Sequence, residues 1–212
     1  MQIVRAARDL DANTELTFQY QPTSAMRTYD ETQKRLRNWG FECTCKLCLE
    51  KKFTPDKMMK KRQSLSLEYD AALRSIQLSR AESLLKQLGE TYSARKGVPY
   101  PELGTQCLEL GSALYLTEGN LTESIYFVLR GLEVLGYSIV ACPPGNTSKE
   151  PVLEVTMWGH ACEPVVLAFL HLSQVYKILA PELSIVARQY AEIAYTINYG
   201  EKESFNERCL DH

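Results

Sequence analysis

Apolar residues recur at the spacing of an α-helix from Ser64 almost to the end of this 212-residue chain. At the start of the pattern, Leu65, Tyr69, Leu73 and Ile76 lie three or four residues apart. Such a stripe is typical of amphipathic helices, which are stable only when they bury their apolar faces against one another. The sequence therefore predicts a mainly α fold.

Glycine and proline divide this helical pattern into segments. The first amphipathic stretch breaks at 97–101, and Pro101 suits the first turn of the next helix because its missing N–H is not needed there. Further helices are expected at 102–117, 121–135, 155–179 and 183–198, with a tight turn at 118–120 and a loop at 143–151. Pro164 lies inside the expected helix 155–179 and could bend it. Residues 201–212 are polar and are expected to fray or to form one more turn.

Tyrosines mark a weak internal repeat in the helical part. Three pairs are separated by 22 or 23 residues: Tyr69 and Tyr92, Tyr115 and Tyr137, and Tyr176 and Tyr199. A unit of helix, short turn and helix is the building block of tetratricopeptide (TPR) arrays. The expected fold is a TPR-like array of antiparallel helical hairpins. The alternative is an irregular α-helical bundle, because the loop at 142–151 departs from the 34-residue TPR spacing.

The first forty residues follow a different pattern. Residues 2–6 and 15–20 are expected to form β-strands around a polar turn that includes Asn13. Two strands alone are marginally stable, so this end of the chain is expected to be a small and incomplete β unit. A helix is expected at 28–39, because Thr28 and Glu31 have the spacing of a capping box and Gly40 is a plausible stop.

The net charge of −2 conceals a strongly basic segment. Residues 34–62 contain ten basic and three acidic side chains, a net charge of +7, so the rest of the chain carries −9. The favoured interpretation is a lysine-rich, solvated linker that ends near Arg62. A contact with nucleic acid is the less favoured alternative, because aromatic residues are sparse in the segment. No stretch approaches 18 consecutive apolar residues, which excludes a transmembrane helix, and no apolar signal segment is seen near Met1.

Three of the seven cysteines, Cys43, Cys45 and Cys48, lie within six residues. A tight turn can direct three such thiolates at one tetrahedral ion, and zinc is the default metal for a redox-silent thiolate site. Free or transiently oxidised thiols are the alternative. Three ligands do not close a structural zinc site, so a fourth must come from elsewhere. The other cysteines lie in the helical part, where they are expected to be small buried hydrophobes, and the odd number fits reduced thiols of the cytoplasm or nucleus.

Two stretches carry a resemblance to a known family: Glu-Leu-Thr-Phe-Gln-Tyr at 15–20 and Trp-Gly-Phe-Glu-Cys-Thr-Cys-Lys-Leu-Cys at 39–48. Together they resemble the end of a SET domain that runs into its cysteine-rich post-SET segment. A TPR-like domain directly afterwards is similar to the SMYD-type branch and to fungal SET/TPR proteins. The implied domains are the C-terminal strands of an incomplete SET domain at 1–28, a post-SET zinc knuckle at 29–53 and a TPR-like helical domain at 54–212.

The resemblance also implies roles for individual residues. Proteins of this family are protein-lysine methyltransferases that use S-adenosylmethionine. Tyr20 matches the family's tyrosine beside the lysine channel, where a buried phenol can orient the substrate amine. Phe41 matches an aromatic residue that lines the cofactor pocket, and Cys43, Cys45 and Cys48 match the three post-SET zinc ligands. Composition alone favours a plainer role for Tyr20 and Phe41, as apolar wall residues.

The chain departs from the family's pattern: the Gly-rich cofactor loop and the MYND finger of the family are missing, and two further differences bear on individual residues. The fourth zinc ligand and the main cofactor contacts of the family come from an upstream Asn-His-x-Cys-x-Pro-Asn segment, which these 212 residues do not contain. Asn13 stands where the family usually has glycine, which is tolerable because asparagine accepts left-handed backbone conformations. We therefore expect the C-terminal portion of a methyltransferase that uses S-adenosylmethionine only in the complete protein and is inactive alone.

A non-catalytic function is the alternative. A TPR-like helical platform can bind an extended or helical peptide, and this use requires neither Tyr20 nor the cysteines. The expected partner is a protein substrate, with histones among the candidates, or a peptide; no membrane partner is expected, and nucleic acid is disfavoured. The expected location is the cytoplasm, the nucleus or both.

Overall fold

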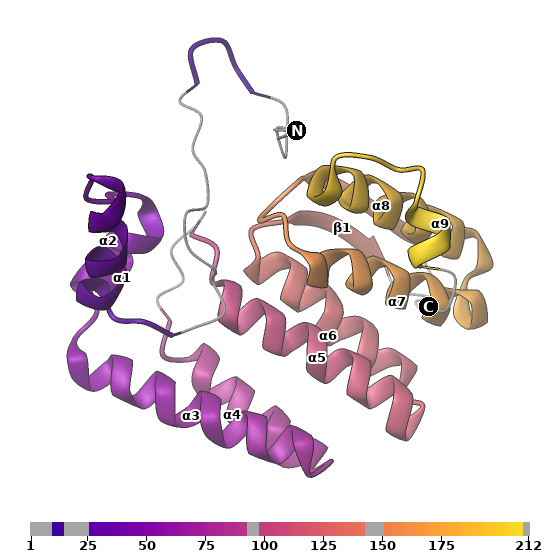
Figure 1. The fold of residues 1–212 in the computed structure, drawn as a ribbon. Coiled ribbons are helices and arrows are strands. Elements are labelled where there is room, and N and C mark those ends of the chain that lie inside the picture. The colour runs from indigo at the N-terminus through magenta and orange to yellow at the C-terminus, as the bar shows by residue number, and fades with distance from the viewer. Residues whose placement is uncertain (1–9, 15–25, 93–97, 143–150, 210–212) are drawn as a thin grey trace.

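Helices in sequential pairs make up most of the molecule. The computed structural model describes residues 10–14, 26–92, 98–142 and 151–209, and its mainly helical content confirms the predicted fold class (Figure 1). The pairs are α3 (Asp56–Arg74) with α4 (Leu78–Gly89), α5 (Pro101–Glu118) with α6 (Leu121–Val134), and α7 (Glu163–Leu179) with α8 (Pro181–Tyr199). Helix α4 also packs on α5 and α6 on α7, so the pairs follow one another in chain order. A TPR-like geometry of these pairs stays a prediction.

The two predicted N-terminal strands, at 2–6 and 15–20, lie outside the described residues, but the turn between them does not. The Asp11 carbonyl accepts hydrogen bonds from the Thr14 N–H at 3.2 Å and from its hydroxyl at 2.7 Å. Asn13 has a φ of 65°, the left-handed conformation predicted for this position.

Helix α1 (Tyr29–Leu36) begins at the predicted capping box. The Thr28 hydroxyl accepts from the Glu31 N–H at 3.3 Å, and the Glu31 carboxylate accepts from the Thr28 N–H at 2.8 Å. A short 3-10 helix, η1 (Arg37–Trp39), continues α1 and ends at Gly40 in the left-handed conformation, with a φ of 78°. Both predicted ends of this helical segment are therefore confirmed.

The basic segment is not a linker, and that prediction was wrong. Its residues form the end of α1, then η1, α2 (Lys46–Phe53) and the first turns of α3. The buried residues of α3 are Met59, Arg62, Leu65, Tyr69 and Ala72, which follow helical spacing. The lysines at 57, 60 and 61 are exposed. The cations therefore belong to the solvent face of an amphipathic helix, and their number concealed its periodicity.

The single amphipathic stretch predicted after Ser64 is divided in two. Helix α3 ends at Arg74, and α4 starts at Leu78 after three intervening residues. Between them Ile76 has a φ of 54° and is 65% exposed. A β-branched residue rarely adopts this conformation. The turn was not predicted because no glycine or asparagine marks it in the sequence.

A β-hairpin occupies part of the predicted helix 155–179, which is the second correction. Strands β1 (Ser138–Cys142) and β2 (Val152–Met157) pair antiparallel, with Ile139 opposite Val155. Helix α7 therefore begins at Glu163, and Pro164 lies in its first turn instead of bending its interior. A proline there sacrifices no helical hydrogen bond, which explains why the helix is uninterrupted.

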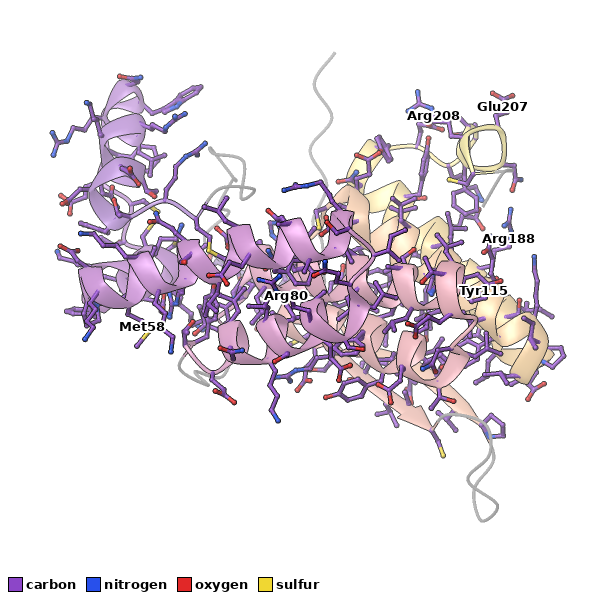
Figure 2. All side chains as sticks on the ribbon, turned by 90° about the horizontal axis from the view of Figure 1, so that it is seen from below. Met58, Arg80, Tyr115, Arg188, Glu207 and Arg208 are labelled. Atoms are coloured by element: carbon purple, nitrogen blue, oxygen red, sulfur yellow. The ribbon has the colours of Figure 1, made fainter. Side chains whose placement is uncertain are left out.

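Of the two outcomes predicted for residues 201–212, fraying or one more turn, the structure has the turn, α9 (Phe205–Arg208). Arg188 of α8 donates to the Asn206 side chain at 3.0 Å, and its guanidinium lies 5.3 Å from the centre of the Phe205 ring. Arg208 lies 5.7 Å from the centre of the Tyr199 ring (Figure 2). These contacts and the burial of Phe205 hold α9 against the end of α8.

Two apolar cores lie between the helix pairs. One surrounds Tyr69, Leu88 and Leu110 of α3 to α5, and the other surrounds Phe169 and Tyr176 with residues of α6 to α8. All five of these side chains are fully buried. No helix among the described residues is long and apolar enough to cross a membrane.

Helices α5 and α6 approach closely because three glycines lie between them. A Cβ on Gly104 or Gly131 would come within 2.7 Å of a leucine side chain of the other helix. A Cβ on Gly111 would lie 2.8 Å from Val128 Cγ2 and 2.9 Å from the Ser124 backbone oxygen. Because the second of these atoms is backbone, the clash at Gly111 is relieved only if the helices separate.

We expect Gly111→Ala to lower the free energy of unfolding by about 1–3 kcal/mol, the usual cost of overpacking. The matched control is Gly89→Ala at the end of α4, where a Cβ meets no atom within 4 Å. The control should be neutral or stabilising, because alanine has the higher helix propensity. Urea unfolding of both variants checks the expectation, and equal midpoints would contradict it.

A half-buried histidine joins the second helix pair to the third. His171 Nε2 of α7 lies 2.6 Å from Ser124 Oγ of α6, and the Tyr115 ring meets the imidazole edge-on at 5.1 Å. Burial lowers the pKa of His171 to about 4. The imidazole is therefore neutral at pH 7.

The low pKa of His171 has a consequence in acid. The pKa of an unperturbed histidine is about 6.5, so between that pH and about 4 the unfolded chain binds the proton and the folded chain resists it. Stability should therefore fall as the pH is lowered through this window. His171→Gln, which can still bond to Ser124, should lose less stability between pH 7 and pH 5 in urea unfolding. An unchanged loss would rule out His171 as its source.

Candidate metal centre

The three clustered cysteines lie at the start of α2. Cys45 is the N-cap residue of this helix, Cys48 is in its first turn, and Cys43 precedes it outside any helix or strand. Cys48 is buried, Cys43 is half-buried and Cys45 is exposed. A helix start brings residues three apart to the same side, so the spacing Cys-x-Cys-x-x-Cys folds the three side chains onto one another.

The sulfur atoms of these cysteines all lie within 4.8 Å of one another. Tetrahedral zinc with bonds of about 2.3 Å would hold its sulfurs about 3.8 Å apart. A small closure of the loop would therefore bring the three Sγ atoms onto one ion. The donor set, three thiols that make no disulfide, fits a thiophilic metal such as zinc.

The three thiols differ in their readiness to ionise. Burial opposes ionisation of Cys45, but hydrogen bonds from the Cys48 N–H and from the neighbouring thiols outweigh it, so its pKa is lowered. Burial raises the pKa of Cys48 to about 12, and the negative charge of a neighbouring Cys45 thiolate adds to the effect. A cation among the sulfurs would remove this mutual repulsion, which is the electrostatic reason for such a cluster to bind metal.

Gln33 of α1 holds the first cysteine in place. Its Nε2 donates to the Cys43 carbonyl at 2.9 Å, and its Oε1 accepts from the Cys43 N–H at 3.0 Å. The Gln33 side chain is only 4% exposed. One amide therefore satisfies both backbone groups of Cys43 and fixes the start of the cysteine loop on α1.

Tyr29 makes a second connection between α1 and the cysteine segment. Its hydroxyl donates to the Glu42 carboxylate at 2.5 Å, and Lys52 of α2 lies 5.3 Å from the centre of its ring. The hydrogen bond to Glu42 is the main reason that the pKa of Tyr29 is raised to about 12. Residues on both sides of the cysteines thus contact the same tyrosine.

Phe41, the predicted cofactor residue, lines a pocket of about 280 Å³ beside the cysteine segment. The pocket lies between α1 and the 40–42 segment, and its other lining residues are Tyr29, Asp30, Gln33, Arg37, Gly40 and Glu42. Phe41 is 36% exposed, so its ring is partly available at this wall. Tyr20, the predicted catalytic residue, lies outside the described residues. The roles of both remain predictions.

A fourth ligand does not join the cluster within the described part of the chain. The three cysteines are the complete group of nearby metal-ligating side chains found there. Of the remaining cysteines, Cys107 and Cys209 are buried and Cys142 and Cys162 are half-buried. Burial raises the pKa of Cys107 to about 12, as expected for a thiol that packs as a small hydrophobe.

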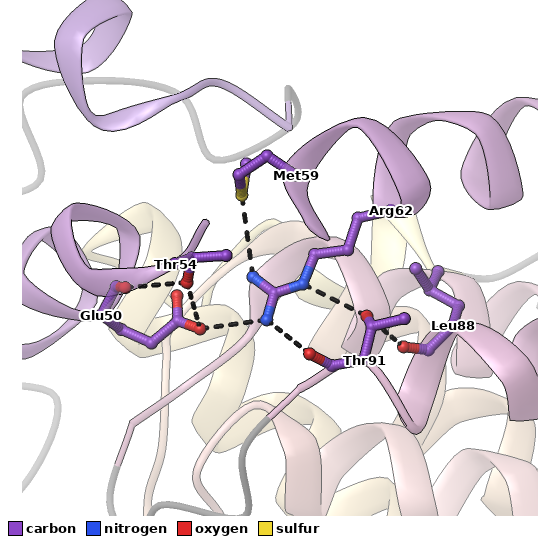
Figure 3. A network of polar contacts seen from close by, with 6 residues as sticks. All are labelled: Glu50, Thr54, Met59, Arg62, Leu88 and Thr91. Carbon is purple, nitrogen blue, oxygen red and sulfur yellow. Dashed lines mark hydrogen bonds and ion pairs between the residues drawn. The ribbon is translucent and has the colours of Figure 1, made fainter. Parts of the chain in front are cut away.

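Sequence analysis missed the polar network that joins the cysteine helix to the helical pairs. Arg62 of α3 donates to the Glu50 carboxylate of α2 at 3.1 Å and to the Thr91 carbonyl, beyond the end of α4, at 2.8 Å (Figure 3). Arg62 and Glu50 are 3% and 4% exposed. The available signal was the position of Arg62, three residues from both Met59 and Leu65 and hence on the buried face of α3.

Comparison with known proteins adds one relative. No protein-family model matches the chain, and no solved structure matches it. Over 214 aligned residues, the chain is 40% identical to a protein of Gibberella zeae named methyltransferase. The match covers 98% of this chain but only 29% of that protein, so the chain spans less than a third of the length of this relative.

We expect Gln33→Met to release the cysteine loop from α1. The Cys43 N–H and carbonyl would lose their partner, which costs roughly 1–3 kcal/mol for a buried polar group. Hydrogen exchange at the Cys43 amide should become faster. Gln87→Met, on the exposed face of α4, is the control and should leave that amide unchanged. Continued protection of Cys43 in Gln33→Met would contradict the role of this side chain.

Proposed function

We propose that this chain is part of a SET-domain protein-lysine methyltransferase, in which S-adenosylmethionine supplies the methyl group. The observation that carries the proposal is the cluster formed by Cys43, Cys45 and Cys48, at the spacing of a post-SET segment, with the sulfurs within 4.8 Å of one another. The 40% identity to a fungal protein named methyltransferase supports the same class of reaction. The proposed substrate is a lysine of a protein, with histones among the candidates.

The cysteines would have a structural role in this function. Cys43, Cys45 and Cys48 would hold a zinc ion, and the fourth ligand would come from an Asn-His-x-Cys-x-Pro-Asn segment that is not among these 212 residues. The fourth ligand would complete the zinc site and fix the post-SET segment against the catalytic domain. Phe41, two residues before Cys43, would be fixed with it. Zinc would thereby fix the wall of the cofactor pocket without taking part in the chemistry.

Two residues of this chain would act at the reacting groups. The Tyr20 phenol would orient the lysine amine and stabilise the charge that changes during transfer, which is a positioning and electrostatic contribution. The Phe41 ring would pack against the cofactor and exclude water from it. Both roles follow from the resemblance to SET domains, and each gives a variant that the experiment can test.

The test is transfer of radiolabelled methyl groups to histones and other basic proteins. The complete protein that contains this chain should be active, and Tyr20→Phe and Phe41→Ala should each reduce the rate about 10-fold or more, the scale of a lost positioning contact. The 212-residue chain by itself should be inactive, because the cofactor segment of the family is absent from it. Methylation by the isolated chain, or full activity of Tyr20→Phe, would overturn the proposal as stated.

Metal binding gives an independent prediction for the isolated chain. We expect it to bind one Co²⁺ or Zn²⁺ weakly, since three sulfurs leave one tetrahedral position to water. Titration with Co²⁺, followed by the thiolate-to-cobalt absorption band, measures the affinity. Cys43→Ser should abolish binding, and Cys142→Ser at the end of β1 is the matched control that should retain it. Unchanged cobalt absorption in Cys43→Ser would exclude this cluster as the site.

A second function is favoured by the helix pairs. The sequential packing of α3 with α4, α5 with α6 and α7 with α8 is the arrangement from which TPR-like peptide platforms are built. If the chain is a non-catalytic module, replacing Cys43, Cys45 and Cys48 by serine should leave its affinity for a partner protein unchanged. Loss of partner binding in that triple variant would instead connect the cysteines to recognition.

A further inference from the structure

Helix α2 carries the metal-ligand candidates and a buried charge on the same short rigid segment. Cys45 caps the helix, Cys48 lies in its first turn, and Glu50 follows two residues later. The helix has eight residues, so the position of Glu50 determines where the two sulfurs lie. A contact that fixes the position of Glu50 therefore also fixes two of the three cysteines.

The Arg62 guanidinium locates Glu50 through several directed contacts (Figure 3). Its Nη2 bonds to Glu50 Oε1 at 3.1 Å and to the Thr91 carbonyl at 2.8 Å, while its Nε donates to the Thr91 hydroxyl at 3.2 Å. The guanidinium also lies 3.8 Å from the centre of the Tyr92 ring. A planar fork held at this many points has one orientation, which a lysine could not reproduce.

The partners of Arg62 are themselves fixed to the helical pairs. The Thr91 hydroxyl donates to the Leu88 carbonyl at 2.6 Å, and Leu88 is fully buried in the first core. On the α2 side, the Thr54 hydroxyl donates to Glu50 Oε1 at 3.1 Å. The network therefore runs without interruption from the core of α3 and α4 to the helix that carries Cys45 and Cys48.

A second ion pair acts in the same direction. Lys51 Nζ of α2 lies 3.9 Å from Glu102 Oε1 in the first turn of α5. Burial raises the pKa of Glu102, and the charge of Lys51 opposes the rise. This pair is longer than the Arg62–Glu50 contact and has a single point of contact, so it restrains the orientation of α2 less.

We propose that Arg62 is a positioning residue for the cysteine cluster, which it orients through Glu50 so that the three sulfurs converge on one metal ion. The inference rests on the proposed metal site and adds to it a determinant outside the post-SET segment. Partners that orient metal ligands without touching the metal typically contribute 10- to 100-fold to affinity. Arg62 acts one step further away, through a helix, and we expect its contribution at the lower end of this range.

The experiment compares Co²⁺ affinity and the cobalt spectrum in three variants of the 212-residue chain. Arg62→Met should weaken Co²⁺ binding about 10-fold and alter the absorption band, because the sulfurs no longer converge. The double variant Glu50→Leu, Arg62→Met removes both charges and should recover much of the folding stability, since apolar groups can replace a buried ion pair. Its Co²⁺ affinity should nevertheless stay low. Gly111→Ala, which weakens the α5–α6 contact far from α2, controls for stability loss alone and should keep wild-type affinity.

Each outcome separates the inference from the metal site on which it rests. Wild-type Co²⁺ affinity in the folded double variant would overturn the positioning role and leave the metal site intact. An affinity in Gly111→Ala as low as in Arg62→Met would also overturn it, because general destabilisation would then explain the loss. Absence of Co²⁺ binding by the wild-type chain would overturn the proposed metal site itself, and with it the inference.

Discussion

The buried ion pair between Arg62 and Glu50 is the interaction on which the connection of the two parts of this chain depends. Removing two opposite charges from water is costly, and the cost is recovered only when their geometry is good and their remaining donors and acceptors are bonded. Here Thr54, Thr91 and the Tyr92 ring complete the surroundings of both charges. The cysteine helix is therefore attached in one orientation, whereas an apolar contact would have allowed several.

The helical pairs, to which this attachment is made, pack closely on one another. Glycines at 104, 111 and 131 let α5 and α6 pack at short range, and each of the two cores buries large side chains from several helices. The neutral His171, bonded to Ser124, continues the contact from the second pair to the third. Displacement of α3 or α4 would disturb Arg62 and Thr91 directly, so the orientation of α2 depends on the packing of its neighbours.

Local chemistry explains which features could be predicted from sequence. The capping box of Thr28 and Glu31, the left-handed Asn13 and the stop at Gly40 each follow from the bonding or conformational freedom of one or two side chains. The turn at Ile76 has no such marker, because the backbone there is dictated by the packing of α3 against α4. The cluster of cysteines could be recognised in the same way. The buried pair of Glu50 and Arg62 could not, since Arg62 also bonds to Thr91, 29 residues further along the chain.

The hairpin of β1 and β2 was not predicted from sequence, because a residue at its edge fits more than one secondary structure. Val155 taken alone is compatible with the start of a helix or with a strand, and its pairing with Ile139 of β1 decides for the strand. Arg62 was wrongly assigned to a solvated linker, because its charge was taken to indicate exposure to solvent. In evolutionary terms, positions 50 and 62 form a coupled pair, because the loss of either charge leaves the other buried without its partner. A lineage can exchange both together for apolar residues, but each single step on that route passes through a less stable protein.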